Sequence, residues 1–252
     1  MPKILIKNKK SLIIVLSTCI LIVCLILANY LSLYLIKTDN QSTSLSSTSF
    51  ELHFITLAKS QVKNEALTLS TDYQSIGAGG FIWENDGYYH VASSAYLNKN
   101  DASLVQNSLK TNNDIESEIF TIKFNSFEIN GTFNNDESKV INKALNIFLE
   151  YYKSIYDIAI SLDTAVYNEI SARMAVNNAH NNLSTTLDNF ELLFKDNDNS
   201  TLTLLHNKLK NAKEISQSLC GGILLNDKQT YSSLLKYRYL EVLHVYYGFL
   251  NS

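Results

Sequence analysis

The feature that most constrains this chain of 252 residues is a run of 26 residues without a charge, from Ser11 to Ile36. At ~1.5 Å per residue, a helix over this run exceeds the ~30 Å thickness of a bilayer's hydrocarbon core. The run is also longer than the ~7–15-residue apolar core of a cleaved signal peptide. We therefore expect a transmembrane helix over residues 11–36 that is retained as an anchor. The alternative is a lipoprotein signal that ends at Cys19.

Basic residues are distributed unequally around this run. Four lysines precede it, whereas Lys37 is the only base that directly follows it. Basic residues beside a membrane span tend to stay in the cytoplasm. We therefore expect residues 1–10 to be cytoplasmic and the rest of the chain after residue 37 to be extracytoplasmic. The predicted localisation is the cell membrane, with a single pass.

The part of the chain after the run is acidic. Five of the 21 basic residues lie at or before Lys37, which leaves 16 against 24 acidic residues and a net charge of about −8. This balance argues against nucleic acid as a partner held by charge. The total of three cysteines excludes a disulfide scaffold. Cys220 is interpreted as a small buried residue, with an intermolecular disulfide as the alternative.

Strand and helix patterns follow a polar, Ser/Thr-rich stretch over residues 37–49, which is expected to be a flexible tether. Alternation predicts strands and apolar spacing predicts helices, in the order strand 50–57, helix 60–75, strands 81–83 and 88–97, helix 101–110 and strand 119–124. The sequence Asn85-Asp86-Gly87 predicts a hairpin between the two middle strands. This β-α-β-β-α-β order predicts a ferredoxin-like α+β domain over residues 50–127.

Two segments of this domain resemble a known family. The segment Tyr89-His90-Val91-Ala92-Ser93-Ser94-Ala95-Tyr96, with Ala102 six residues later, is similar to a strand and helix start of SPOR domains. These are small peptidoglycan-binding modules of bacterial division and sporulation proteins. The strand from Leu52 to Leu57 is similar to the family's opening strand. The chain departs from the family's usual glutamine, glycine and arginine at four positions: His53, Ile55, His90 and Ser94.

The resemblance implies peptidoglycan as a partner, and the residue types allow such a site. Sugars present C–H faces and hydroxyls, so a sheet that binds them needs aromatic platforms and a few hydrogen-bonding groups. Alternation places His53 with Ile55, and Tyr88 with His90, on one face of their respective strands. Trp83 as a core residue and the histidines as solvated residues are the alternatives. The candidate glycan-binding residues are His53, Ile55, Trp83, Tyr88, His90, Ser94 and Tyr96.

From Asp136 onward the apolar residues recur at helical spacing. Eight of them form an a/d pattern over four heptads: Ile141, Leu145, Phe148, Tyr152, Ile155, Ala159, Leu162 and Val166. Glu169 and Arg173 interrupt the pattern, which leaves one long helix or two open. Further helices are expected over residues 202–219 and 229–250. Short polar connections then predict an all-α antiparallel bundle over residues 134–252. The alternative is that the seam pairs two copies of the chain.

Motifs that superficially suggest chemistry do not fit their requirements. Gly77-Ala78-Gly79-Gly80 follows a predicted helix and precedes a strand, the reverse of a phosphate-binding loop. The stretch from Asp196 to Ser200 lacks the glycine and distal glutamate of a calcium loop. The histidines lack the spacing of a metal site. We therefore expect a non-enzymatic protein without a cofactor or metal.

Together these observations predict a membrane-anchored bacterial envelope protein. Its SPOR-like domain would bind peptidoglycan glycan strands during cell division or sporulation. Its coiled-coil-like helical domain would bind a protein partner or a second copy of the chain. The alternative is a structural subunit of an extracytoplasmic ring or scaffold that does not bind glycan.

Overall fold

The computed structural model describes residues 42–195, 197–220 and 229–252. The predicted cytoplasmic segment, the predicted transmembrane helix and the start of the predicted tether lie outside the described residues. Within the described ranges, no helix has both the length and the hydrophobicity to cross a membrane. Of the described residues, those within 44–129 and 137–252 form one compact unit, and 42–43 and 130–136 belong to a second. The first of these units contains the four-stranded sheet and its cavities.

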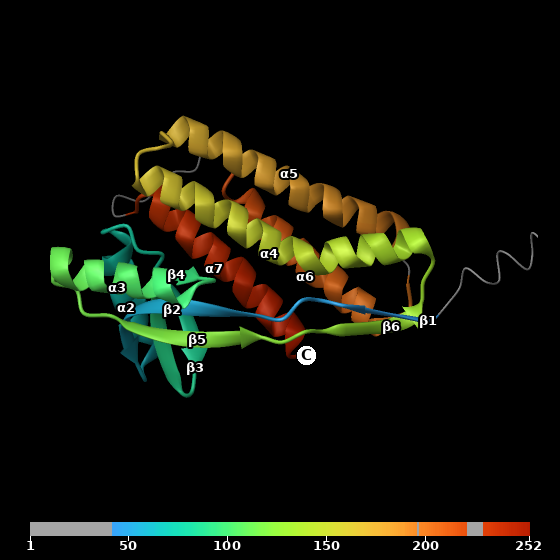
Figure 1. The fold of residues 1–252 in the computed structure, drawn as a ribbon, viewed down its shortest axis with the longest axis horizontal. Helices are drawn as coiled ribbons and strands as arrows, with labels where there is room; N and C mark the ends of the chain where they lie inside the picture. Colours follow the sequence, from blue (N-terminus) through green and yellow to red (C-terminus); the bar gives the residue numbers. More distant parts are fainter. Residues whose placement is uncertain (1–41, 196, 221–228) are drawn as a thin grey trace, which may run out of the picture. The chain divides into compact units, whose positions relative to one another are not determined.

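A four-stranded antiparallel sheet with two helices follows the order expected from the sequence. In chain order its elements are β2 (Phe50–Ser60), α2 (Lys63–Gln74), β3 (Phe81–Asn85), β4 (Tyr88–Tyr96), α3 (Lys99–Asn113) and β5 (Glu118–Phe124). The strands lie side by side in the order β3-β4-β2-β5, and each pair of neighbours is antiparallel (Figure 1). β2 and β4 are therefore the two central strands of the sheet. The prediction of a mixed α+β fold is confirmed.

The turn between β3 and β4 shows how the local sequence determines this arrangement. Asp86 has a φ of 51° and Gly87 a φ of 77°. A two-residue hairpin turn whose twist matches its strands requires positive φ at both central positions. Glycine adopts such values without strain, and aspartate tolerates them. The turn aligns the two strands so that Trp83 lies opposite His90.

A strand lies within the stretch that was expected to be a flexible tether. In the structure, β1 (Ser42–Ser46) pairs with β6 (Glu128–Thr132) in a separate two-stranded sheet. The backbone N–H of Ser47 donates to the carbonyl of Phe127, and the hydroxyl of Ser47 accepts from the N–H of Phe127. These partners are 80 residues apart in the sequence. The polar composition of residues 42–46 could not reveal a pairing over that distance, so the tether prediction is corrected there.

In the described residues of the C-terminal part there are four helices: α4 (Asn135–Asp163), α5 (Glu169–Phe194), α6 (Ser200–Gln217) and α7 (Tyr231–Leu250). The interruption at Glu169 therefore separates two helices. The side chain of Asn168 caps the start of α5 by accepting a hydrogen bond from the N–H of Ser171. Val166, the last residue of the predicted seam, falls between the helices and is 72% exposed.

The seam residues of α4 pack within the chain, against α7 and the sheet. Tyr152 contacts Tyr239, and Phe148 contacts Tyr246, with ring centroids 5.3 and 4.7 Å apart. Residue numbers rise along α4 as they fall along α7, so the two helices are antiparallel. α5 and α6 are antiparallel for the same reason, because His180 contacts Ser216 whereas the later Glu191 contacts the earlier His206. The C-terminal region is helical, as predicted.

Tyrosine hydroxyls join these helices to the edge of the sheet. The pairing of β4 with β3 ends at Ala92. Beyond it, the hydroxyl of Tyr239 accepts from the backbone N–H of Ala95 at 3.3 Å, and the hydroxyl of Tyr152 donates to the carbonyl of Ala95 at 2.8 Å. Buried backbone groups need hydrogen-bond partners. The helices therefore supply backbone hydrogen-bond partners to the part of β4 that extends beyond β3.

Candidate functional site

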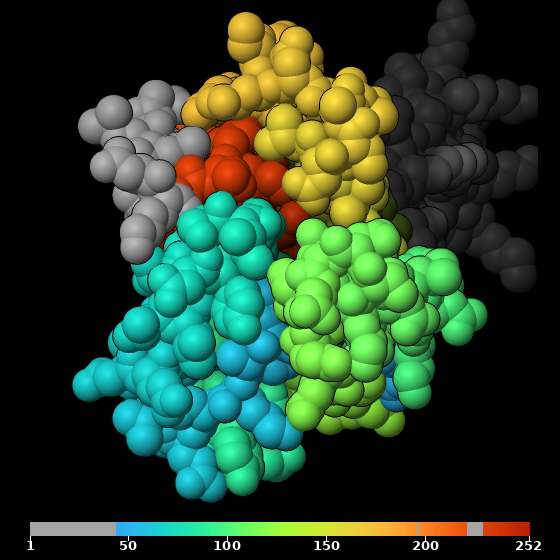
Figure 2. Space-filling view, turned by 90° about the vertical axis from the view of Figure 1, so that its left-hand side faces the viewer, coloured from blue at the N-terminus to red at the C-terminus, as the bar shows by residue number. Residues whose placement is uncertain are grey.

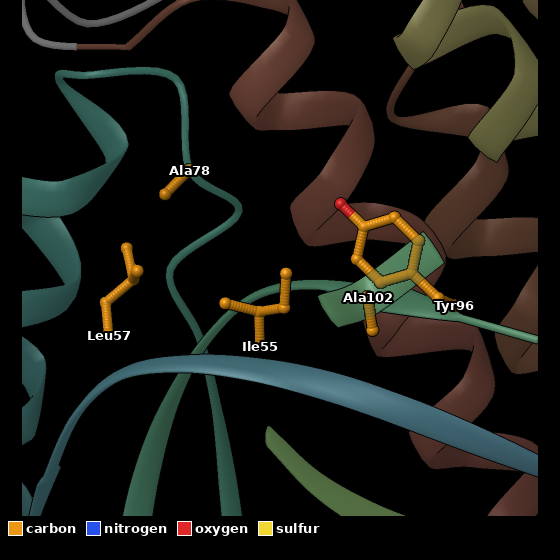
Figure 3. Close-up of a cluster of buried hydrophobic side chains, with 5 residues drawn as sticks. All are labelled: Ile55, Leu57, Ala78, Tyr96 and Ala102. Atoms are coloured by element: carbon orange, nitrogen blue, oxygen red, sulfur yellow. The ribbon is translucent and has the colours of Figure 1, made fainter. Parts of the chain in front are cut away.

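The two faces of the four-stranded sheet are packed differently. One face meets α2 and α3 through a core cluster that includes Ile55, Leu57, Tyr96 and Ala102. Figure 3 shows Ile55, Leu57 and Tyr96 projecting from the strands toward the side where Ala78 lies. Side chains alternate between faces along a strand. Phe54, which neighbours Ile55, therefore projects from the opposite face.

That opposite face is an aromatic surface that extends over all four strands. The ring of Phe54 on β2 lies 4.9 Å from the ring of Trp83 on β3 and 4.9 Å from that of Phe120 on β5. Phe120 in turn stacks on His90 of β4, with ring centroids 4.5 Å apart. The small Thr56 is the next residue of β2 on this face after Phe54, which leaves room for the rings on either side to approach.

One part of this surface, here called the covered half, consists of Phe81, Trp83 and Phe124 beneath α7. The ring of Trp83 lies 5.0 Å from that of His244 and 5.5 Å from that of Tyr247. Phe81 contacts Tyr237 and His244, and Phe124 contacts Tyr246 and Tyr247. Trp83 is 2% exposed as a result. The covered half therefore belongs to the core between sheet and helix.

The other part, here called the open half, consists of Tyr88, His90 and Phe120. Among the described residues, the ring contacts of these three are with one another and with Phe54, and none is with a helix. Tyr88 is 37% exposed, whereas His90 is 9% exposed. The open half is therefore a stacked aromatic surface with one edge in solvent.

An ion pair borders the open half. The ammonium of Lys59 lies 2.8 Å from a carboxylate oxygen of Glu118 and 5.9 Å from the centre of the Tyr88 ring. The hydrogen bond that Lys59 donates to Glu118 raises the pKa of the Lys59 ammonium. Both side chains are largely exposed, so the pair adds polarity at this border rather than much stability.

Two buried polar atoms on this face have no hydrogen-bond partner among the described residues: Thr56 Oγ1 and His90 Nδ1. A hollow of about 250 Å³ is lined in part by Thr56, Lys59, Ser117 and Glu118, and the hydroxyl of Ser117 also lacks a partner among the described residues. Burial, assisted by the charge of Lys59, lowers the pKa of His90. The imidazole is therefore neutral near pH 7 and offers Nδ1 as a donor or an acceptor, depending on its tautomer.

This arrangement is suited to binding a ring with hydroxyl groups. Flat aromatic side chains can stack on C–H faces, while the unpartnered atoms can exchange hydrogen bonds with hydroxyls. Buried polar groups in proteins usually have a partner, so these atoms supply unused hydrogen-bonding capacity. No group of three or more possible metal ligands occurs in the described part of the chain.

A histidine–serine contact elsewhere resembles a catalytic pair. Nδ1 of His180 lies 2.6 Å from the hydroxyl of Ser216, in the helical region. Ser216 is fully buried, and its hydroxyl donates to the carbonyl of Lys213. A nucleophile must reach its substrate, so we interpret this contact as a structural hydrogen bond between α5 and α6.

The structure separates the seven candidate residues between the two faces of the sheet. Tyr88 and His90 lie together in the open half, and Trp83 lies in the covered half. The other four lie on the face toward α2 and α3: His53, Ile55, Ser94 and Tyr96. On that face, Nδ1 of His53 is 2.8 Å from the hydroxyl of Thr121, and Ser94 donates to the hydroxyl of Tyr96.

Sequence analysis missed four residues of the site: Thr56, Lys59, Glu118 and Phe120. The alternation of β5 does place Glu118 and Phe120 on one face of a strand. What the sequence lacks is the position of β5 beside β2, which brings Phe54 opposite Phe120 and Thr56 opposite Glu118. In this strand order, with β2 between β4 and β5, the ring of His90 meets that of Phe120.

Comparisons with known proteins give one solved structure. No protein-family model matches the chain, and no curated protein matches it. The chain is similar to the solution structure of the peptidoglycan binding domain of the B. subtilis cell wall lytic enzyme CwlC, with 21% sequence identity and a TM-score of 0.26. That likeness covers 30% of this chain and 95% of the other.

Proposed function

We propose that this chain is a non-enzymatic bacterial envelope protein that binds peptidoglycan glycan strands through the open half of its sheet. The observation that carries the proposal is the combination of an uncovered aromatic stack with unpartnered buried polar atoms beside it. Sugar C–H faces would stack on Tyr88 and Phe120. Sugar hydroxyls would bond to His90 Nδ1, Thr56 and the Lys59–Glu118 pair.

Two further observations support a SPOR-like module. Numbered from β2 along the chain, the strands lie in the order 2-3-1-4, which agrees with a ferredoxin-like sheet over residues 50–124. The segment that resembles the family, Tyr89 to Tyr96, forms most of the central strand β4. Under this proposal the covered half stabilises the fold, and glycan contacts come from the open half and its border.

The proposal places the protein at the cell membrane. The uncharged run from Ser11 to Ile36 would be the anchor, with residues 1–10 in the cytoplasm and the sheet and helices outside, where peptidoglycan lies. Cell division and sporulation are the processes that the family resemblance suggests. The helical region would bind a protein partner or a second copy.

The test is co-sedimentation of the detergent-solubilised full chain with peptidoglycan sacculi, before and after an amidase removes the stem peptides. Neighbouring tyrosines provide a matched pair of variants, because Tyr88 projects from the aromatic face and Tyr89 from the other. Loss of a stacking platform should weaken binding by about tenfold in Tyr88→Ala. Tyr89→Ala should bind as the wild type does. Equal binding by both variants, or no binding by the wild type to either preparation, would refute the site.

A second candidate function is a structural subunit of an extracytoplasmic assembly. Exposed apolar side chains of α5 favour it, since Ile170 and Met174 lie one turn apart on the same face and are both solvent-exposed. Light scattering of the full chain in a defined detergent would measure its oligomeric state. A discrete oligomer that ignores both kinds of sacculi would favour this function over glycan binding.

A further inference from the structure

A second, larger cavity lies at the face of the sheet that meets α2 and α3. Its volume is about 500 Å³, and its walls come from that face, the turn after α2, α3, α4 and α7. Figure 2 shows the surface hollowed where these segments meet. Small-molecule sites typically measure ~300–1,000 Å³, so the cavity has the size of a ligand site.

The walls of this cavity are mainly apolar. They include Leu57, Ala78, Val105, Leu109, Tyr156 and Ile160. Protein interiors are otherwise packed as densely as organic crystals. A water molecule in a cavity needs ~2–4 polar partners to be well held, and most of this wall offers none. The cavity is therefore better suited to hydrocarbon than to ordered water.

At one end of the cavity, two oppositely charged side chains form an ion pair. The ammonium of Lys236 lies 2.6 Å from a carboxylate oxygen of Asp163 and donates to the carbonyl of Gly77 at 2.9 Å. The other carboxylate oxygen of Asp163 accepts from the hydroxyl of Ser232. Because each charge already has an opposite charge and a hydrogen bond, this end offers no net charge to a ligand. It favours a neutral molecule over an ion.

The hydroxyl of Tyr96 is a hydrogen-bond donor in the wall of this cavity. The hydroxyl of Tyr96 accepts a hydrogen bond from Ser94 at 3.0 Å, so its own O–H is still free to donate. Figure 3 shows this hydroxyl pointing away from Ala102 and up from the sheet. Burial raises the pKa of Tyr96, which keeps the hydroxyl protonated. A single acceptor atom on a ligand would complete this group.

We propose that this cavity binds a neutral, largely hydrocarbon small molecule that carries one hydrogen-bond acceptor, such as a ketone, ester or amide oxygen. Leu57, Val105 and Leu109 contact its hydrocarbon part, and Tyr96 donates to its acceptor. Two residues first considered for glycan binding, Ser94 and Tyr96, therefore belong to this separate site. The proposal is independent of glycan binding by the open half.

Photolabelling of the purified full chain with benzophenone tests this proposal. Benzophenone is neutral and apolar, has one ketone oxygen, and forms adducts with nearby C–H groups under ultraviolet light. Mass spectrometry of the peptides then locates the adducts. We expect saturable adducts on the α3 and α4 segments that line the cavity. The anionic analogue 4-benzoylbenzoate should require about tenfold higher concentration, because the site offers no uncompensated cation.

Neighbouring residues of α3 supply matched variants. Val105 lines the cavity, whereas Leu104 is 68% exposed and does not. Val105→Trp should fill the space and abolish the saturable adducts, while Leu104→Trp should retain them. Tyr96→Phe should weaken labelling about fivefold through loss of one hydrogen bond. Non-saturable adducts scattered over exposed residues, or equal labelling of the two tryptophan variants, would overturn the proposal.

Discussion

The covered and open halves of one sheet face contain the same kind of side chain but are packed differently. Trp83 in the covered half is 2% exposed and packs edge-on against His244 of α7. Tyr88 in the open half is 37% exposed, and its ring neighbours are Lys59 and His90. Residue type therefore does not determine whether an aromatic side chain is buried in the core or left at the surface. What determines it here is whether α7 lies above it.

The two halves also differ in their polar groups. Where the helices reach the sheet, Tyr152 and Tyr239 satisfy the backbone of Ala95. In the open half and beside it, His90 Nδ1 and Thr56 Oγ1 are buried without partners among the described residues. Buried hydroxyls without a partner among the described residues also occur in the helical core, at Tyr151 and Tyr231, so it is the aromatic surface beside Thr56 and His90 that distinguishes the open half.

The largest expected effect comes from the covered half. Trp83→Ala should lower the free energy of unfolding by about 3–5 kcal/mol, because it leaves a cavity between sheet and α7. Tyr88→Ala should change it by less than about 0.5 kcal/mol, because it removes a partly exposed ring. Urea denaturation followed by circular dichroism measures both. Similar losses in the two variants would mean that the halves do not differ as described.

The next effect concerns the tyrosine that completes the edge of β4. Tyr239→Phe removes the hydroxyl that accepts from Ala95, so a buried N–H is left unsatisfied. The free energy of unfolding should fall by about 1–3 kcal/mol. Tyr237→Phe is the control, because it also removes one hydroxyl on α7 but keeps the ring contact with Phe81. The same loss in both variants would contradict a specific role for Tyr239.

The smallest effect is a pH dependence that arises in the open half. Burial holds the pKa of His90 below its usual value of 6.5. The unfolded chain therefore takes up a proton first as the pH falls, so stability should decrease from about pH 6.5 downward. His180 acts in the same direction, because burial also lowers its pKa. His90→Gln should lose less stability than the wild type between pH 7.5 and pH 5, and an identical loss would exclude a contribution from His90.

Local sequence predicted the elements well because their causes are local. The Asp86-Gly87 turn follows from backbone geometry, and the buried seam of α4 follows from heptad spacing. The site was predicted only in part. Tyr88 and His90 lie in it, but Ser94 lies on the other face, because the pairing of β2 with β4 shifts register near Ile55 and Thr56. A register shift of this kind cannot be predicted from the alternation of polar and apolar residues along a strand.

The features that the sequence did not predict depend on contacts between residues far apart in the chain. Nothing near Trp83 in the sequence indicates that His244 and Tyr247 pack on it, more than 150 residues later. Phe120 belongs to the site because β5 lies beside β2, which the sequence of β5 does not indicate. The pairing of β1 with β6 has the same origin. Each of these features depends on which segments meet in space rather than on the pattern within a segment.

The most direct test of the account uses Trp83, the only tryptophan of the chain, as a reporter in the covered half. The full chain is saturated with soluble glycan strands that lack stem peptides, and acrylamide quenching of Trp83 emission is measured before and after. If glycan binds the open half, α7 stays in place, so the emission maximum and the quenching should not change. Binding that shifts the emission to longer wavelength and increases quenching would show that glycan displaces α7. That result would contradict the division into covered and open halves.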